Sequence, residues 1–226
     1  MRGIAVIGGE SPAPEALRII AAEADLLAAA DSGLIACEDA GLKPDWVVGD
    51  MDSLDKLSRL DKYPPRRVMR FPCDKDYTDT ELALALLREK GCSEIWIAGG
   101  GGGRLDHLFG LRALFEMEEG PDRWFPGNEE ILCIKEGWGL KAEVPAGSII
   151  SVFPLGKKEC AAGSRGLKWP LDNVIWKCGY SGVSNVATEG SFEISSIKGH
   201  FMVIMPIILD STKNITVKNI TVRMMK

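Results

Sequence analysis

Residues 78–107, TDTELALALLREKGCSEIWIAGGGGGRLDH, contain the local signals that decide the fold. A T-x-x-E capping box, Thr78 and Glu81, opens an apolar run at helical spacing, and Gly91 follows it. This pattern predicts a helix over residues 78–91. The apolar run at residues 94–100 is typical of a buried strand, and a glycine run separates it from a second helical stretch at residues 105–117. Such an order of elements indicates an α/β fold.

The same alternation extends through the first half of the chain. Strands are expected at residues 3–9, 25–31, 45–52, 66–71 and 94–100. Helices are expected at residues 14–24, 34–40, 78–91 and 105–117. Strands that alternate with helices usually pair in parallel, so the predicted fold class is α/β with a parallel sheet in the N-terminal part.

The second half differs in composition. From about Pro121 onward Pro, Gly, Trp and Asn cluster and helical periodicity ends. We therefore expect two domains, an α/β domain over residues 1–125 and an all-β domain over residues 126–226. A doubled KNITV at residues 213–222 is compatible with a terminal strand pair. The strands expected in this half lie at residues 129–135, 148–155, 173–178, 191–196 and 200–205.

Composition limits the class of protein. The chain has 226 residues, 46% of them apolar, and a net charge of −5. A negative chain without blocks of like charge argues against binding to nucleic acid or to an anionic membrane surface. No apolar run is long enough for a membrane span, and residues 1–9 have the pattern of a buried strand rather than of a signal peptide, so a cytoplasmic location is expected.

The cysteines have no C-x-x-C spacing, and most lie in apolar segments. Buried, reduced thiols that pack as small hydrophobic groups are therefore expected rather than a zinc site or a redox pair. The six residues are Cys37, Cys73, Cys92, Cys133, Cys160 and Cys178.

Acidic residues follow the carboxyl ends of the predicted strands, where open parallel sheets bind ligands. Each alone is most simply a turn former or a helix cap. Two carboxylates about 4 Å apart repel by roughly 4 kcal/mol at an effective dielectric constant near 20, so several together need a compensating cation. The expected set comprises seven acids and two cations: Asp31, Asp50, Asp52, Asp74, Asp76, Asp79 and Asp106, with Lys75 and Arg104.

The pair Asp50 and Asp52 is the strongest candidate for a metal site. In an extended chain the i, i+2 spacing would place both side chains on the same side. No Cys or His lies near them in the sequence, so an all-oxygen site that suits Mg²⁺ is expected. The alternative is an exposed acidic turn.

The glycine run at residues 99–103 is the candidate phosphate site. Its N–H groups and the following helix N-terminus could hold phosphate oxygens, with Arg104 as a bidentate partner and Lys75 as a point charge. The run matches neither the P-loop pattern nor G-x-G-x-x-G. A flexible surface turn is the alternative. His107 could contact the ligand or lie on the helix surface, and His200 is expected to be structural.

The second half offers a candidate binding segment, GLKWPLDN, at residues 166–173. Trp169 could be a core or turn aromatic residue. Exposed beside Ser184 and Asn185, it would instead form a stacking surface for a flat heterocycle.

Together these segments resemble the thiamine pyrophosphokinase family over roughly residues 3–206. Two departures are Ser32, where the family has glycine, and Met51, often Phe in the family. The motifs are ADSG (30–33), GDMDSL (49–54), DKDYTDTELAL (74–84), GGGGRLDH (100–107), GLKWPLDN (166–173) and SN (184–185).

The resemblance implies a parallel α/β catalytic domain, a C-terminal β-sandwich, and a homodimer with active sites between subunits. It also implies that ATP donates its β,γ-pyrophosphoryl group to the hydroxyl of thiamine, with Mg²⁺ as cofactor and release of AMP. The implied catalytic residues are Asp50, Asp52, Asp79 and Arg104, and the implied metal ligands are Asp50, Asp52 and Asp79. The implied ATP-binding residues are Asp31, Ser32, Gly33, Asp74, Lys75, Asp76, Thr78, Gly102, Gly103, Arg104, Asp106 and His107. The implied thiamine-binding residues are Trp169, Ser184 and Asn185.

Two other functions remain open on the sequence. A metal-dependent sugar or nucleotidyl transferase could also use a D-x-D pair at a strand end. A sensor of thiamine or nucleotide without activity is the non-enzymatic alternative, and Ser32 is the residue that hints at it.

Overall fold

The computed structural model describes residues 1–156, 159–176, 179–209 and 215–219, and it divides into two compact units, Met1–Asn128 and Glu129–Lys226. The sequence placed this boundary after residue 125. No helix among the described residues is long and apolar enough to cross a membrane.

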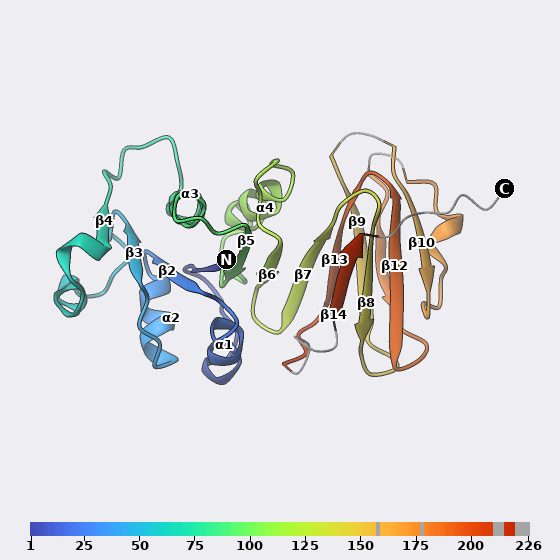
Figure 1. The fold of residues 1–226 in the computed structure, drawn as a ribbon, viewed down its shortest axis with the longest axis horizontal. Helices are drawn as coiled ribbons and strands as arrows, with labels where there is room; N and C mark the ends of the chain where they lie inside the picture. Colours follow the sequence, from blue (N-terminus) through green and yellow to red (C-terminus); the bar gives the residue numbers. More distant parts are fainter. Residues whose placement is uncertain (157–158, 177–178, 210–214, 220–226) are drawn as a thin grey trace. The chain divides into compact units, whose positions relative to one another are not determined.

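The first unit contains a parallel sheet of strands β6, β5, β1, β2, β3 and β4 in that order. Helices α1 and α2 lie on one face of this sheet, and α3 and α4 lie on the other (Figure 1). The strands are β1 (Arg2–Val6), β2 (Leu26–Ala30), β3 (Trp46–Gly49), β4 (Val68–Arg70), β5 (Glu94–Ala98) and β6 (Arg123–Phe125). The helices are α1 (Pro14–Ala21), α2 (Gly33–Asp39), α3 (Asp79–Glu89) and α4 (Leu105–Leu114), with short 3₁₀ turns at Leu57–Lys62 and Pro65–Arg67.

The capping box of α3 is confirmed. The Glu81 backbone N–H donates to Thr78 Oγ1 at 3.2 Å, and the Thr78 N–H donates to Glu81 Oε2 at 2.8 Å. Two otherwise unpaired backbone donors at the helix start are thereby used. The start of α3 is fixed in this way, and with it the position of Asp79, its first residue.

The second unit contains two antiparallel sheets, β11-β9-β13-β7 and β10-β12-β8-β14. Side chains of both sheets share one apolar core, in which Phe192, Ile194 and Phe201 are almost fully buried. The strands are β7 (Glu129–Ile134), β8 (Trp138–Glu143), β9 (Ile149–Leu155), β10 (Ala161–Arg165), β11 (Gly182–Val186), β12 (Ser191–Lys198), β13 (His200–Pro206) and β14 (Ile215–Asn219), and a 3₁₀ turn covers Leu171–Asn173.

The predicted mixed α/β chain with a second, antiparallel sheet is confirmed, with one wrong strand. In the strand expected at 173–178, Asn173 ends a 3₁₀ turn, residues 174–176 follow that turn, and Trp176 makes only an isolated bridge to Cys160. Residues 177 and 178 lie outside the described part, as does the second KNITV copy after Asn219. Four further strands, β6, β8, β10 and β11, were not expected because they are short or interrupted by glycine and polar residues.

Candidate active site

Three carboxylates from different segments meet at one edge of the parallel sheet. Asp31 follows β2, Asp50 follows β3 and Asp79 begins α3, and their ligand oxygens all lie within 4.8 Å of one another. Gly49 makes this approach possible, because a Cβ there would lie 3.2 Å from Asp79 Oδ1 and 3.4 Å from Asp31 Cβ. We call Asp31, Asp50 and Asp79 the acidic trio.

Lys75 partly neutralises the acidic trio. Its Nζ lies 3.1 Å from Asp50 Oδ2 and 3.2 Å from Asp79 Oδ1, and its side chain is only 13% exposed. Burial disfavours the ammonium, but hydrogen bonds to Asp50 and Asp79 outweigh it and raise the pKa of Lys75. Asp31 Oδ1 is buried and has no hydrogen-bond partner among the described residues. Three carboxylates against one ammonium leave an excess of negative charge.

The environment separates the pKa values of Asp50 and Asp79. The pKa of Asp50 is lowered, chiefly because the Asp52 backbone N–H donates to it, and Lys75 adds to this effect against burial. The pKa of Asp79 is raised because burial outweighs the attraction of Lys75. A cation bound by the acidic trio would favour the ionised form of both carboxylates.

Strained backbone marks the predicted sites. Among the described residues only three that are not glycine have positive φ: Asp31 (48°), Met51 (68°) and Ser184 (59°). Such residues cost about 1–3 kcal/mol each and are typical of functional sites, where the surrounding structure imposes the conformation. Asp31 belongs to the acidic trio, Met51 follows Asp50 directly, and Ser184 is one of the predicted thiamine residues.

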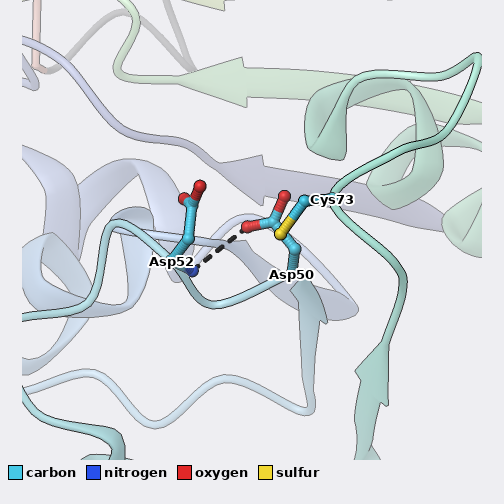
Figure 2. Close-up of side chains that lie close together, drawn as sticks. All are labelled: Asp50, Asp52 and Cys73. Atoms are coloured by element: carbon cyan, nitrogen blue, oxygen red, sulfur yellow. Dashed lines mark hydrogen bonds between the residues drawn. The ribbon is translucent and has the colours of Figure 1, made fainter.

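Met51 changes the expected geometry of the D-x-D pair. Its left-handed conformation turns the chain, so the expectation of an extended segment is wrong, although Asp50 and Asp52 still bring ligand oxygens within 4.8 Å of each other. The Asp52 backbone N–H donates to Asp50 Oδ1 at 3.1 Å (Figure 2). A ligand oxygen of Asp52 lies within 4.8 Å of ligand atoms of Asp50 and Cys73. Asp52 does not belong to the cluster that contains Asp79. The predicted metal set of Asp50, Asp52 and Asp79 is therefore divided between two groups that share Asp50.

Cys73 was not anticipated at the site. It lies beside Asp50, although 23 residues separate the two in the sequence (Figure 2). Its exposure contradicts the expectation of buried thiols, which holds for Cys37, Cys92 and Cys160. Cys133 is half-buried, and Cys178 lies outside the described residues.

The variant Cys73→Ser tests whether a metal ion binds to the acidic trio or to the cluster of Asp50, Asp52 and Cys73. If the acidic trio holds it, Cys73→Ser keeps turnover within about twofold of wild type, because the thiol then contacts no reacting group. Steady-state rates at saturating magnesium measure this. A loss of about a hundredfold, the cost of removing a group that stabilises the transition state, would instead place the ion between Asp52 and Cys73.

The backbone N–H groups of the glycine run at residues 99–103 fall into two sets, those that are hydrogen-bonded within the protein and those that can bind a ligand. The N–H groups of Gly99, Gly100 and Gly101 donate to backbone carbonyls, so the expectation that they face a phosphate is wrong. A Cβ at Gly99 would lie 2.3 Å from the carbonyl oxygen of Ile7, which explains why the strand end requires glycine. The N–H groups of Gly102 and Gly103 make no hydrogen bond within the described residues, and both residues have positive φ.

The other predicted nucleotide residues are distributed around the loops. Arg104 pairs with Asp106 through two hydrogen bonds, of 3.1 and 2.5 Å, and both side chains are more than 60% exposed. The Arg104 guanidinium lowers the pKa of Asp106 to about 2. The exposed Asp74 and Asp76 belong to neither of these two clusters, so the seven expected acids do not form one tight cluster.

The last four predicted nucleotide residues are Thr78, His107, Ser32 and Gly33. Thr78 caps α3, and His107 is exposed in the first turn of α4. A Cβ on Gly8 would lie 2.3 Å from Ser32 Oγ, so the serine hydroxyl uses the space beside Gly8. A Cβ on Gly33 would lie 2.1 Å from the carbonyl oxygen of Val6.

The predicted thiamine residues of the second unit lie together. Asn185 is buried, accepts from the Trp169 N–H at 3.1 Å and donates to the Trp169 carbonyl at 2.6 Å. The backbone of Trp169 is thereby fixed, while its indole is 53% exposed and has Lys168 Nζ 4.6 Å from the ring centroid. The neighbouring Ser184 is exposed and donates its N–H to Ser151 Oγ. The interpretation of Trp169 as a core aromatic residue is wrong.

These features define a class: an α/β protein with acidic groups at the carboxyl ends of a parallel sheet, followed by an antiparallel β unit. Residues 17–119 match the family model described as "Thiamin pyrophosphokinase, catalytic domain". This match places a thiamine pyrophosphokinase catalytic domain in the first unit, and together with the solved structures below it supports an enzyme of the thiamine diphosphokinase type.

Solved structures agree over nearly the whole chain. The thiamine pyrophosphokinase of Bacillus subtilis is 25% identical with a TM-score of 0.75, covering 90% of this chain and 98% of that one. The enzyme of Geobacillus thermodenitrificans is 26% identical with a TM-score of 0.72, covering 92% and 98%. A family protein from Enterococcus faecalis, 24% identical with a TM-score of 0.74 and covering 92% and 100%, shares the fold. No curated protein sequence matches this chain.

Proposed function

We propose that this enzyme transfers the β,γ-pyrophosphoryl group of ATP to the hydroxyl of thiamine, with release of AMP. The convergence of Asp31, Asp50 and Asp79 within 4.8 Å carries the proposal. Phosphoryl-type transfer depends mainly on positioning and on charge neutralisation, and it needs a site that holds a cation against a polyphosphate.

The acidic trio fits a magnesium ion. Its donors are carboxylate oxygens only, one of them buried without a partner, and hard oxygen ligands suit Mg²⁺. Bound magnesium would supply neutralisation of phosphate charge and orientation of the transferred group. Lys75 would remain beside Asp50 and Asp79 as a second positive charge. The free N–H groups of Gly102 and Gly103, with Arg104, would hold the remaining phosphate oxygens.

Arg104 would exchange partners when the nucleotide binds. It pairs with Asp106 at the surface, where solvent screens the ion pair and leaves it little effect on stability. A bidentate hydrogen bond to a phosphate could replace it at little cost. Asp106 would thus hold the guanidinium near the glycine run between turnovers.

The second unit would bind thiamine through Trp169. Thiamine carries a positively charged thiazolium ring and a flat pyrimidine ring, and an exposed indole attracts both. The ammonium of Lys168 over the indole shows that the ring accepts a cation. We therefore propose residues 1–125 as the ATP- and magnesium-binding domain and residues 126–226 as the thiamine-binding domain.

One assay tests the proposed function. Purified protein is incubated with ATP, Mg²⁺ and thiamine, and AMP, ADP and thiamine phosphates are separated by chromatography. We expect AMP and thiamine diphosphate in equal amounts, and none of either without magnesium. ADP with thiamine monophosphate would indicate transfer of a single phosphate instead. Binding of both substrates without turnover would favour the sensor.

The variant Trp169→Ala tests the thiamine site. Loss of base-like stacking costs about 1–3 kcal/mol, so we expect the KM for thiamine to rise about 10- to 100-fold, with the KM for ATP unchanged. Trp138, a half-buried tryptophan packed against the core of the same unit, offers the control Trp138→Phe. An unchanged thiamine KM in Trp169→Ala would remove the indole from the site.

Assembly, location and partners complete the proposal. We propose a homodimer with active sites between subunits, as the family resemblance implies. We also propose a cytoplasmic location without binding to nucleic acid or membranes, as the charge and pattern of the sequence indicate. Sedimentation equilibrium tests the assembly, with a dimer expected at twice the chain mass of 24.6 kDa. A monomer that is fully active at assay concentration would contradict it.

A further inference from the structure

The order of the strands marks a second position on the same edge of the sheet. From β1 the chain adds β2, β3 and β4 on one side, and β5 and β6 pair on the other side. The order therefore reverses between β1 and β5, and open α/β sheets bind ligands in the crevice outside such a point. Asp31 and Asp50 of the acidic trio instead follow β2 and β3, so the point beyond the ends of β1 and β5 is a separate position for a ligand.

Glu10 is an acidic residue at this position, in the loop that follows β1. Its backbone N–H and carbonyl form a reciprocal bridge with Gly101, at 2.7 and 2.9 Å. A Cβ at Gly102 would lie 3.1 Å from Glu10 Oε2, and a Cβ at Gly127 would lie 2.9 Å from Oε1. Two glycines from separate segments thus leave room for the two carboxylate oxygens, and the backbone bridge fixes where the side chain starts.

The carboxylate of Glu10 lacks a partner. No hydrogen-bond donor or cation among the described residues reaches either of its oxygens, and the residue is exposed. A carboxylate repels phosphate, so Glu10 cannot belong to the phosphate-binding part of the glycine run. It can accept hydrogen bonds, and two adjacent hydroxyl groups present the two donors that a carboxylate binds best.

We infer that Glu10 binds the ribose hydroxyl pair of the nucleotide and so makes the enzyme selective for ribonucleotides. The inference rests on the proposed use of ATP. Gly102 and Gly103 would hold phosphate beside Glu10, and a ribose adjoins the phosphates of every nucleotide. Dinucleotide-binding folds also use an acidic side chain to accept a hydrogen bond from a ribose hydroxyl.

Binding measurements without turnover test the inference. Calorimetry compares AMP with 2′-deoxy-AMP on wild type, Glu10→Gln and Glu10→Ala, with Glu15→Gln as the control, an exposed glutamate of α1 paired with Arg18. A hydrogen bond to a charged group is worth about 1.5–3 kcal/mol, so we expect wild type to prefer AMP by about tenfold or more. We expect Glu10→Ala to bind AMP and 2′-deoxy-AMP with affinities within twofold of each other, because only the binding of AMP is weakened. We expect Glu15→Gln to retain the wild-type preference for AMP.

The outcomes separate this inference from the proposed function. Normal AMP binding with an unchanged preference in Glu10→Ala would overturn the role of Glu10 and leave the proposed function standing. Equal weakening of both ligands would also overturn it, since Glu10 would then only support the loop. A changed preference between AMP and inosine monophosphate, with the ribose preference intact, would assign Glu10 to the base and overturn the inference. No binding of AMP to wild type, together with no AMP from ATP and thiamine, would overturn the proposed function itself.

Discussion

Asp50→Asn is expected to lower turnover by about 10²- to 10³-fold, the usual cost of removing one group that stabilises transition-state charge. Asp50 belongs both to the acidic trio and to the cluster with Asp52 and Cys73. The variant therefore weakens a metal site in either cluster. Its oxygens also accept from the Asp52 N–H and from Lys75. An amide can accept one of these bonds but carries no charge to hold a cation.

The fold is expected to survive this substitution. Lys75 keeps its ion pair with Asp79, and the exchange of a carboxylate for an amide removes no apolar contact. The comparison is Asp39→Asn, an exposed acid at the end of α2, for which wild-type turnover is expected. Rates of AMP formation are measured across a magnesium titration, with circular dichroism to check the fold. A rate for Asp50→Asn within threefold of wild type would show that the acidic trio holds no catalytic cation.

Local signals explain why the elements of the first unit could be predicted. The T-x-x-E box and Gly91 delimit α3 in the sequence, and the structure begins that helix at Asp79 and ends it at Glu89. Strands buried on both faces are continuous apolar runs; β2 and β5 lie inside the segments expected for them, and β1 begins one residue before its expected segment. The strands of the second unit were harder to predict from the sequence. β10 (AAGSR) and β11 (GVSNV) lack apolar alternation and depend on pairing with distant strands.

The candidate site was predictable in residue type but not in grouping. Asp31, Asp50 and Asp79 could be nominated because each follows a strand or begins a helix at one edge of the sheet. The separation of Asp52 from Asp79 depends on the left-handed backbone of Met51, and no side-chain pattern predicts a positive φ at methionine. The approach of Cys73 to Asp50 is a tertiary contact between two loops, which no spacing within either loop encodes.

The departure at Ser32 is explained by the structure. Ser32 has φ −63° and lies in ordinary helical backbone, so a side chain is allowed there. Its hydroxyl occupies space that Gly8 leaves open. The serine therefore gives no structural support to the sensor hypothesis, and the requirement for glycine falls on the next residue.

Gly33→Ala is expected to destabilise the fold by about 3 kcal/mol or more, at the upper end for overpacked sites. Gly33 begins α2, and a Cβ there would lie 2.1 Å from the carbonyl oxygen of Val6 and 2.6 Å from its carbonyl carbon. Those atoms belong to β1 in the middle of the parallel sheet and cannot move without breaking its pairing with β2 and β5. The helix must shift instead, and Asp31 shifts with it because α2 starts two residues later.

The measured quantities are the apparent Tm and the magnesium dependence of activity. Since about 1 kcal/mol shifts the Tm of a chain of this size by roughly 2–4 °C, Gly33→Ala should melt at least about 6 °C lower. The matched control is Gly110→Ala in α4, where a Cβ meets nothing within 4 Å. That substitution should be neutral or stabilise by up to about 1 kcal/mol through helix propensity. If Gly33→Ala melted like Gly110→Ala, α2 would have room to move away from β1, and the close contact would not be what holds Asp31 at the acidic trio.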